Sequence, residues 1–373
     1  MKNKVKKVLK EIIYFFKKKN RAIGITIAYK KEIKTFSKNI KIKKIYSDFE
    51  KEHIKKWKNL YPKASSIWFR VYSEYIGRPD VNIIPDNIFH IIVEPILNNY
   101  QQNILAEEKN YYSQIYSKFN QPLTLLRNIN GIYTDKNYSM IYNIDEFIEK
   151  LKIKNDKIII KPSIDSGSGK NVDVFKLSGN NYMNKRGDYL NLQYLNNFYG
   201  KDFIIQEFLK QSPILSKYNL DSINTLRILT YRSVVNNEVY ILHSVLRVGK
   251  KGVYVDNAHA GGTFCAVDED GRLLNKIYDD KGKIYYHFNG HNITNDDVIP
   301  NYDKVLNFSK HIAENTFHAR LLSLDIMIDE FDMPKLIEIN TMGQGVMFFQ
   351  MTKGAMFGEF TDEIINYCIK NYK

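Results

Sequence analysis

Residues 321–345, LLSLDIMIDEFDMPKLIEINTMGQG, contain two apolar runs on either side of a polar turn at 329–334. Apolar runs of this length with a turn between them predict two antiparallel β-strands. If the two strands pair about this turn, the facing positions are counted outward from its centre. The expected pairs are Leu324 with Ile339, Asp325 with Glu338, and Ile326 with Ile337.

The two faces of this predicted hairpin differ in polarity. Because side chains alternate between faces along a strand, Asp325, Glu338 and Asn340 share one face. The core-facing residues are expected to be Leu324, Ile326, Ile328, Ile337 and Ile339. Two facing carboxylates repel unless positive charge lies between them, and two carboxylates with an amide oxygen form a ligand set suited to Mg²⁺. The alternative is an exposed polar face whose charges pair with nearby lysines.

A second stretch, IIIKPSIDSGSGKNV at 158–172, combines an apolar run, a lysine and a loop of serine and glycine. It lacks the glycine and lysine order of a Walker A loop, the third glycine of a dinucleotide loop, and the kinase order of glycines before lysine. Lys161 at the end of a strand, followed by glycines, instead predicts a lid hairpin over a phosphate. The backbone N–H groups that would close over the phosphate include those of Ser166, Gly167, Ser168 and Gly169. An ordinary surface hairpin is the alternative.

Composition limits the class of protein. The chain has 373 residues, enough for two or three domains, and its only cysteines are Cys265 and Cys368. Two cysteines are too few for a disulfide framework or a zinc cluster, which favours the reducing cytoplasm. No apolar run approaches the length of a membrane-spanning helix.

The net charge of +14 is concentrated at one end of the chain. Residues 1–60 contain 20 of the 55 basic residues and 5 of the 41 acidic ones, so the remainder has 35 basic and 36 acidic residues. Apolar residues at helical spacing lie among these lysines: Val5, Leu9, Ile12, Ile13 and Phe16. This pattern predicts a basic amphipathic helix, which either packs on its own protein or contacts an anionic membrane. Basic and aromatic residues do not interleave here, which argues against nucleic acid.

The remaining pattern predicts a mixture of helices and strands. Residues 61–155 read as mostly helical, with breaks at prolines and at Gly131. Strands are expected at 157–161, 173–177, 203–208, 225–233, 239–248, 262–267, 321–328 and 335–340, and helices at 302–317 and 361–369. The fold class is therefore α+β, or mixed α/β.

Together these features resemble the ATP-grasp superfamily. The resemblance rests on Lys161 with its glycine lid, on IIQEFL at 204–209, and on the spacing of Asp325, Glu338 and Asn340. A closer similarity is to the ATP-grasp family associated with sugar transfer and surface-polysaccharide loci. It is carried by SINTLRILTYR (222–232), VDNAHAGG (255–262) and Val298-Ile299-Pro300, and the likeness extends over roughly 75–345.

The resemblance implies an ATP-grasp fold of two α+β subdomains that grip ATP. Its implied boundaries are a basic helical extension at 1–60, a helical pre-grasp region at 61–155, a lid subdomain at 156–210 and a metal-binding subdomain at 211–373.

The resemblance also implies residue roles. Lys161 and Lys109 would contact the α- and β-phosphates. Glu108 stands where this family often has an aspartate, directly before Lys109. Arg227 would hold the γ-phosphate or the developing acyl phosphate, and the alternative is a structural ion pair within its apolar strand. Asp325, Glu338 and Asn340 would bind one or two Mg²⁺, with Mn²⁺ as a substitute. The adenine would be read by the connector Gln206, Glu207, Phe208 and Leu209.

The implied activity is that of an ATP-dependent carboxylate–amine ligase working through an acyl phosphate. Its partners would be a small carboxylate and an amine or sugar, in cell-surface polysaccharide or glycoconjugate synthesis. The expected location is cytoplasmic, and the N-terminal helix either contacts the inner face of the membrane or packs on the protein. Two alternatives remain: a kinase or phosphotransferase of the same fold, and a non-catalytic peripheral membrane protein.

Overall fold

A computed structural model describes residues 2–42, 47–164, 171–253, 256, 258–294 and 296–372, with side chains except those of 2–18 and 259. The chain divides into two compact units. The first contains Met1–Asn98, Lys281–Lys283 and Gly345–Lys373, and the second contains Asn99–Asp280 and Ile284–Gln344. No helix among the described residues combines the length and apolar composition that crossing a membrane requires.

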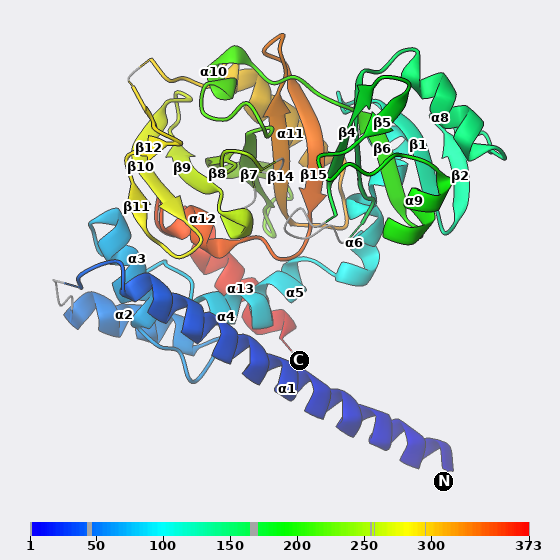
Figure 1. The fold of residues 1–373 in the computed structure, drawn as a ribbon. Coiled ribbons are helices and arrows are strands. Elements are labelled where there is room, and N and C mark those ends of the chain that lie inside the picture. Colours follow the sequence, from blue (N-terminus) through cyan, green and yellow to red (C-terminus); the bar gives the residue numbers. More distant parts are fainter. Residues whose placement is uncertain are drawn as a thin grey trace. The chain divides into compact units, whose positions relative to one another are not determined.

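The first unit is helical. Its elements are α1 (Lys2–Ser37), α2 (Ser47–Lys58), α3 (Ile67–Ile76), α4 (Asp86–Ile88), η1 (Phe89–Val93), α5 (Glu94–Leu97), α12 (Val346–Gln350), η5 (Gly358–Phe360) and α13 (Thr361–Asn371). Aromatic side chains fill its core, among them Trp57, Trp68 and Phe69, each at most 1% exposed. The long helix α1 contributes the buried Ile33 and Phe36 from its C-terminal half, whereas its N-terminal half extends away from the other helices of this unit (Figure 1). The predicted N-terminal helix is therefore confirmed.

The second unit contains two large antiparallel sheets, drawn next to each other in Figure 1, and one two-stranded sheet. The six-stranded sheet has the order β2-β1-β6-β3-β4-β5. Its strands are β1 (Thr124–Ile129), β2 (Ile132–Asp135), β3 (Lys157–Pro162), β4 (Asp173–Ser178), β5 (Asn181–Met183) and β6 (Phe203–Glu207). Helices α8 (Ile144–Lys152) and α9 (Leu192–Phe198) share its apolar core through Ile148 and Leu195.

The seven-stranded sheet has the order β11-β10-β9-β8-β7-β14-β15. Its strands are β7 (Thr225–Arg232), β8 (Val239–Val248), β9 (Thr263–Val267), β10 (Leu273–Asp279), β11 (Ile284–Tyr285), β14 (Leu321–Ile328) and β15 (Pro334–Asn340). The helix α11 (Tyr302–Glu314) packs on it through Val305 and Ile312. The smaller elements of this unit are α6 (Tyr100–Glu107), η2 (Lys109–Tyr111), α7 (Tyr112–Ile115), α10 (Pro213–Ser216), η4 (Ala258–Ala260), β12 (His287–Phe288) and β13 (His291–Asn292).

The strands predicted from residue 157 onward are present with small shifts at their ends, but the prediction of mostly helix over 61–155 is wrong at 124–135. There β1 and β2 form a hairpin in which Ile129 pairs with Ile132 around Asn130 and Gly131. Both turn residues have positive φ, 50° and 89°, as a two-residue hairpin turn of type I′ requires. An Asn-Gly pair between two apolar residues is typical of such a turn. Gly131 was instead interpreted as a break between helices.

The pairing of β14 with β15 confirms two of the three expected pairs. Asp325 faces Glu338 and Leu324 faces Ile339, but Ile326 faces Leu336 rather than Ile337. The register shifts between Asp325 and Ile326, as a β-bulge in β15 produces, so one extra residue enters that strand. Leu336 therefore joins the apolar core in place of Ile337, which lines a pocket instead.

Candidate active site

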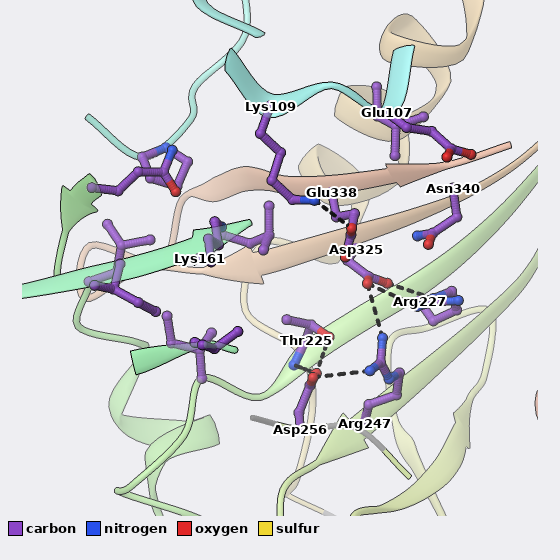
Figure 2. A pocket seen from close by; sticks show the side chains of 18 of the residues that line it. Glu107, Lys109, Lys161, Thr225, Arg227, Arg247, Asp256, Asp325, Glu338 and Asn340 are labelled. Carbon is purple, nitrogen blue, oxygen red and sulfur yellow. Dashed lines mark hydrogen bonds and ion pairs between the residues drawn. The ribbon is translucent and has the colours of Figure 1, made fainter. Parts of the chain in front are cut away.

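A pocket of about 430 Å³ lies within the second unit and is lined by residues from both of its large sheets. Figure 2 shows the charged side chains that gather in it. Asp325, Glu338 and Asn340 all line this pocket, so the structure brings together the three residues that the hairpin pattern placed on one face. The Nδ2 of Asn340 donates to the Ser323 carbonyl at 3.1 Å, which leaves its side-chain oxygen as the atom that can accept a ligand.

Two arginines surround the carboxylate of Asp325. Arg227 lies directly opposite it on β7 and donates from Nε to Oδ1 at 2.5 Å and from Nη2 to Oδ2 at 2.9 Å. Arg247, on β8, donates from Nη1 to Oδ2 at 3.0 Å. Burial alone would raise the pKa of Asp325, but the two guanidinium groups outweigh burial and hold this pKa below its ordinary value. Asp325 is therefore kept ionised inside the protein.

Arg247 also reaches a second, partly buried acid, Asp256, which the sequence pattern did not indicate. Its Nη2 contacts Oδ1 of Asp256 at 3.1 Å, and Asp256 accepts from both the backbone N–H and the hydroxyl of Thr225. Arg247 thus connects the 255–262 motif to Asp325. A charged residue within the apolar strand 239–248 was the available signal, but its partners are distant in sequence and become apparent only in the fold.

Lys109 lies in the short 3₁₀ turn η2 and is 4% exposed. Its Nζ forms an ion pair with Oε1 of Glu338 at 2.6 Å. Burial raises the pKa of Glu338, and Lys109 more than offsets this, so the pKa lies below its ordinary value. The neighbouring Glu108 caps the turn by accepting from the Asn110 N–H at 3.0 Å, which gives this departure from the family pattern a structural role.

Glu107, a further pocket residue that the sequence reading missed, accepts from both the N–H and the hydroxyl of Thr341, at 2.7 and 2.6 Å. Burial raises the pKa of Glu107 above its ordinary value. These two bonds tie the end of α6 to the residue that follows Asn340, so Glu107 supports the carboxylate hairpin from the outside.

Lys161 differs from every other base in the pocket. It is 9% exposed, and its ammonium group makes no hydrogen bond or ion pair with any residue that the structure describes. Burial, reinforced by repulsion from Lys109, lowers the pKa of Lys161 to about 8, and the charges of Glu338 and Asp325 offset this only in part. A buried ammonium group without an acid partner is a ready site for an anion. The glycine loop at 166–169 lies outside the described residues.

The connector Gln206, Glu207, Phe208 and Leu209 lines the same pocket. The carboxylate of Glu207 accepts from the backbone N–H of Leu123 at 2.9 Å, and the Glu207 N–H donates to the Leu123 carbonyl at 3.0 Å. Phe208 and Leu209 follow the end of β6, so their backbone groups lie beyond its strand pairing. Gln206 is 6% exposed, and its Oε1 has no hydrogen-bond partner among the described residues. The ammonium group of Lys157 lies over the ring of Phe208, 3.5 Å from the ring centroid.

The donor set of the pocket fits a hard cation. Two carboxylates and one amide oxygen suit Mg²⁺, which commonly takes its remaining ligands from water and phosphate. In the described part of the chain, no cluster of three or more His, Cys, Asp or Glu residues forms an alternative metal site. The described lining has six acids (Glu107, Glu207, Asp221, Asp256, Asp325 and Glu338) and four bases (Lys109, Lys161, Arg227 and Arg247). A polyphosphate entering this acidic excess is favoured when a cation accompanies it.

The fold is similar to solved ATP-grasp ligases. The ligase PsnB, solved with a phosphomimetic precursor variant, Mg and ADP, is 12% identical with a TM-score of 0.39, over 73% of this chain and 62% of its own. D-alanine–D-alanine ligase from Bacillus anthracis is 12% identical with a TM-score of 0.40, over 73% and 69%. D-cycloserine synthetase DcsG is 9% identical with a TM-score of 0.39, over 72% and 71%. The chain thus spans less than two thirds of the length of PsnB.

No curated protein matches the sequence significantly. The model of the family described as "Sugar-transfer associated ATP-grasp" matches residues 91–364, a span that begins and ends later than the resemblance estimated from the motifs. This match covers most of the chain and includes every pocket residue discussed above. The chain belongs to the sugar-transfer associated ATP-grasp family.

Proposed function

We propose that this protein is an ATP-dependent ligase that joins a carboxylate to an amine through an acyl phosphate. The observation that carries the proposal is Lys161, a buried ammonium group without an acid partner among the described residues, which faces two ionised carboxylates across one pocket. The family supplies the ATP-grasp type, and the pocket chemistry supports phosphoryl transfer.

In this proposal Lys161 and Lys109 bind the α- and β-phosphates, while Glu207 and the backbone of Phe208 and Leu209 contact the adenine. The glycine loop that includes Ser166, Gly167, Ser168 and Gly169 closes over the phosphates and excludes water. Mg²⁺, one or two ions with Mn²⁺ as a substitute, would be held by Asp325, Glu338 and Asn340 and would neutralise phosphate charge.

The proposed reaction proceeds in two steps. A carboxylate oxygen of the substrate attacks the γ-phosphorus, and the bond to the ADP oxygen breaks. The amine nitrogen of the second substrate then attacks the acyl carbon, phosphate leaves, and the nitrogen loses a proton to give the amide. Arg227 stabilises the negative charge of the transferred phosphoryl group, and it is kept in place by its two bonds to Asp325.

We propose that one substrate is destined for a cell-surface polysaccharide or glycoconjugate, and the description of the family as sugar-transfer associated supports a link to sugar transfer. We place the reaction in the cytoplasm, where ATP is available, and both cysteines are free and buried, in keeping with a reducing compartment.

The test is ADP release with Mg·ATP across sugar acids, amino acids and amines, with the product identified by mass. The proposal expects ADP release that requires both a carboxylate and an amine, with a product mass equal to the two substrates less water. ADP release without an amine, together with a stable phosphorylated product, would identify a phosphotransferase instead. Nucleotide binding without turnover for any pair would favour a non-catalytic role.

We also propose that α1 contacts an anionic membrane surface. Residues 2–37 contain 12 basic and 2 acidic residues, and Ile23 and Ile27 are 49% and 64% exposed. At about 100° per residue, these two positions lie on the same side of the helix as positions 5, 9, 12 and 16, away from the buried Ile33 and Phe36. The helix therefore has an apolar stripe that the first unit does not cover at Ile23 and Ile27.

Glutamate at both Ile23 and Ile27 is expected to weaken binding to phosphatidylserine vesicles by about tenfold, because apolar burial is lost and negative charge is added. Co-sedimentation measures this binding, and Ile153→Glu provides the control, since Ile153 is an 81% exposed isoleucine of the second unit. Equal binding of all variants would contradict the membrane role.

A further inference from the structure

Arg127, on β1, is a buried arginine whose contacts are all uncharged. It is 1% exposed and donates to the Asn110 carbonyl at 3.0 Å, to the Asp135 carbonyl at 2.8 Å and to the Ser113 hydroxyl at 2.8 Å. No carboxylate of the described residues forms an ion pair with it. Burial lowers the pKa of Arg127, and Tyr138 and the charge of Asp135 offset this effect only in part. Burying a charged group without an ion pair costs free energy, so the presence of an arginine at this position requires an explanation.

The three acceptors belong to different segments, and two of them adjoin the turn that carries Lys109. The Asn110 carbonyl accepts from Arg127 and also from the hydroxyl of Tyr138 at 2.7 Å. The side chain of Asn110 donates to the Asn128 carbonyl at 3.1 Å. Asn110, the residue next to Lys109, therefore both accepts from β1 and donates to it. A planar guanidinium group can serve several acceptors at once, which an ammonium group does less well.

Tyr138 completes this arrangement. Its ring lies 4.2 Å from the guanidinium carbon of Arg127, and its hydroxyl also contacts the Ser113 hydroxyl at 2.9 Å. Tyr138 has a φ of 64°, a conformation that is unfavourable for a bulky side chain. The surrounding contacts maintain this strained backbone, which indicates that the position of the ring over Arg127 is specified by the fold.

The Lys109 turn is also bonded to the strand that carries Lys161. The backbone N–H of Lys109 donates to the Ser163 carbonyl at 2.9 Å, two residues beyond Lys161. Lys109 is therefore fixed to the six-stranded sheet through its backbone, while its ammonium group reaches Glu338 on the seven-stranded sheet. Lys109 is thus hydrogen-bonded to the segment that directly follows the strand of Lys161, although the two lysines are distant in sequence.

We propose that Arg127 is a positioning residue that fixes the Lys109 turn to the six-stranded sheet, so that Lys109 and Lys161 approach the nucleotide phosphates as one body. This inference rests on the proposed function, because it takes Lys109 as a phosphate ligand. Arg127 itself lies outside the pocket lining and acts only through the turn that it holds.

A double-mutant cycle on Mg·ADP binding, measured by calorimetry with the full chain, tests this inference. Arg127→Gln is expected to weaken binding about tenfold, the scale of one charged hydrogen bond. Tyr138→Phe, which keeps the ring and removes one donor to Asn110, should weaken it by a factor of about three. In a Lys109→Ala background both effects should vanish, because there is no longer a lysine to position.

Arg186→Gln is the control, since Arg186 is an exposed arginine of the same sheet region that pairs with Asp173 and Asp188. It should leave binding unchanged in either background. Should Arg127→Gln fail to fold, Tyr138→Phe carries the cycle alone.

The outcomes separate this inference from the function on which it rests. If Lys109→Ala weakens binding but the Arg127 and Tyr138 effects persist unchanged in its background, their role is structural and the positioning role is wrong. If Lys109→Ala binds as tightly as the wild type, the positioning role is also wrong, whereas the ligase assignment continues to depend on the ADP-release test.

Discussion

The two large sheets of the second unit present opposite electrostatic conditions to one pocket. On the seven-stranded sheet, Asp325 is paired with two arginines and Glu338 with Lys109. On the six-stranded sheet, Lys161 has no partner among the described residues. The pKa of Asp325 is lowered because its charge is stabilised, whereas the pKa of Lys161 is lowered because its charge is not. The difference indicates that Lys161, on the six-stranded sheet, is the group in the pocket whose charge a negatively charged ligand would stabilise.

Removing the acid from the seven-stranded sheet should have the largest effect. Asp325→Asn leaves Arg227 and Arg247 buried without the carboxylate between them, and the loss of one partner of a buried pair costs about 3–5 kcal/mol. Urea unfolding measures this loss. If the free energy of unfolding changes by less than about 1 kcal/mol, the ion pairs of Asp325 contribute little to stability. The proposed difference in charge pairing between the two sheets would then be wrong.

Glu338→Gln should separate function from stability on the same sheet. Glu338 accepts from Lys109 and is partly exposed, with 29% of its side chain accessible, so glutamine should preserve the fold. ATP turnover should fall by about 10²–10³-fold, the scale of removing one charge-stabilising group from a phosphoryl-transfer site. The matched control is Glu330→Gln, in the turn of the same hairpin. Turnover near the wild-type rate would contradict the metal assignment of Glu338.

The pH dependence of nucleotide binding should report the charge of Lys161. With a pKa of about 8 in the free protein, Lys161 is protonated at pH 7 and mostly neutral at pH 9, and phosphate favours the protonated form. The Kd for Mg·ADP should therefore rise about tenfold from pH 7 to pH 9, and binding near pH 8 should take up a proton. Lys161→Arg stays charged throughout this range and should remove the dependence. An unchanged slope in this variant would assign the titration to another group.

The sequence predicted the β14–β15 hairpin well because its two apolar runs and single turn are local. The same local pattern could not reveal the bulge that exchanges Leu336 for Ile337, since a one-residue insertion leaves the apolar runs unchanged. The β1–β2 hairpin was missed although its Asn-Gly turn is local, because the surrounding residues also suit helices.

The charge network of the pocket was less accessible to sequence reasoning. Arg247, Asp256 and Thr225 are brought together only by the pairing of β7 with β8 and by the loop beyond β8. The attachment of Lys109 to the six-stranded sheet depends on Arg127 and Ser163, which are distant from it in sequence. Residue types indicated which chemistry was present, whereas the tertiary fold determined which charges are paired.

A crystal structure with Mg·AMPPNP tests the central claim most directly, which is that the phosphates bind at Lys161 and the cation at the carboxylate hairpin. The account predicts a phosphate oxygen within about 3.2 Å of Lys161 Nζ, at hydrogen-bond distance, and a metal ion bound by Asp325, Glu338 and Asn340. A nucleotide bound with its phosphates away from Lys161, or a metal ion held by other residues, would contradict it.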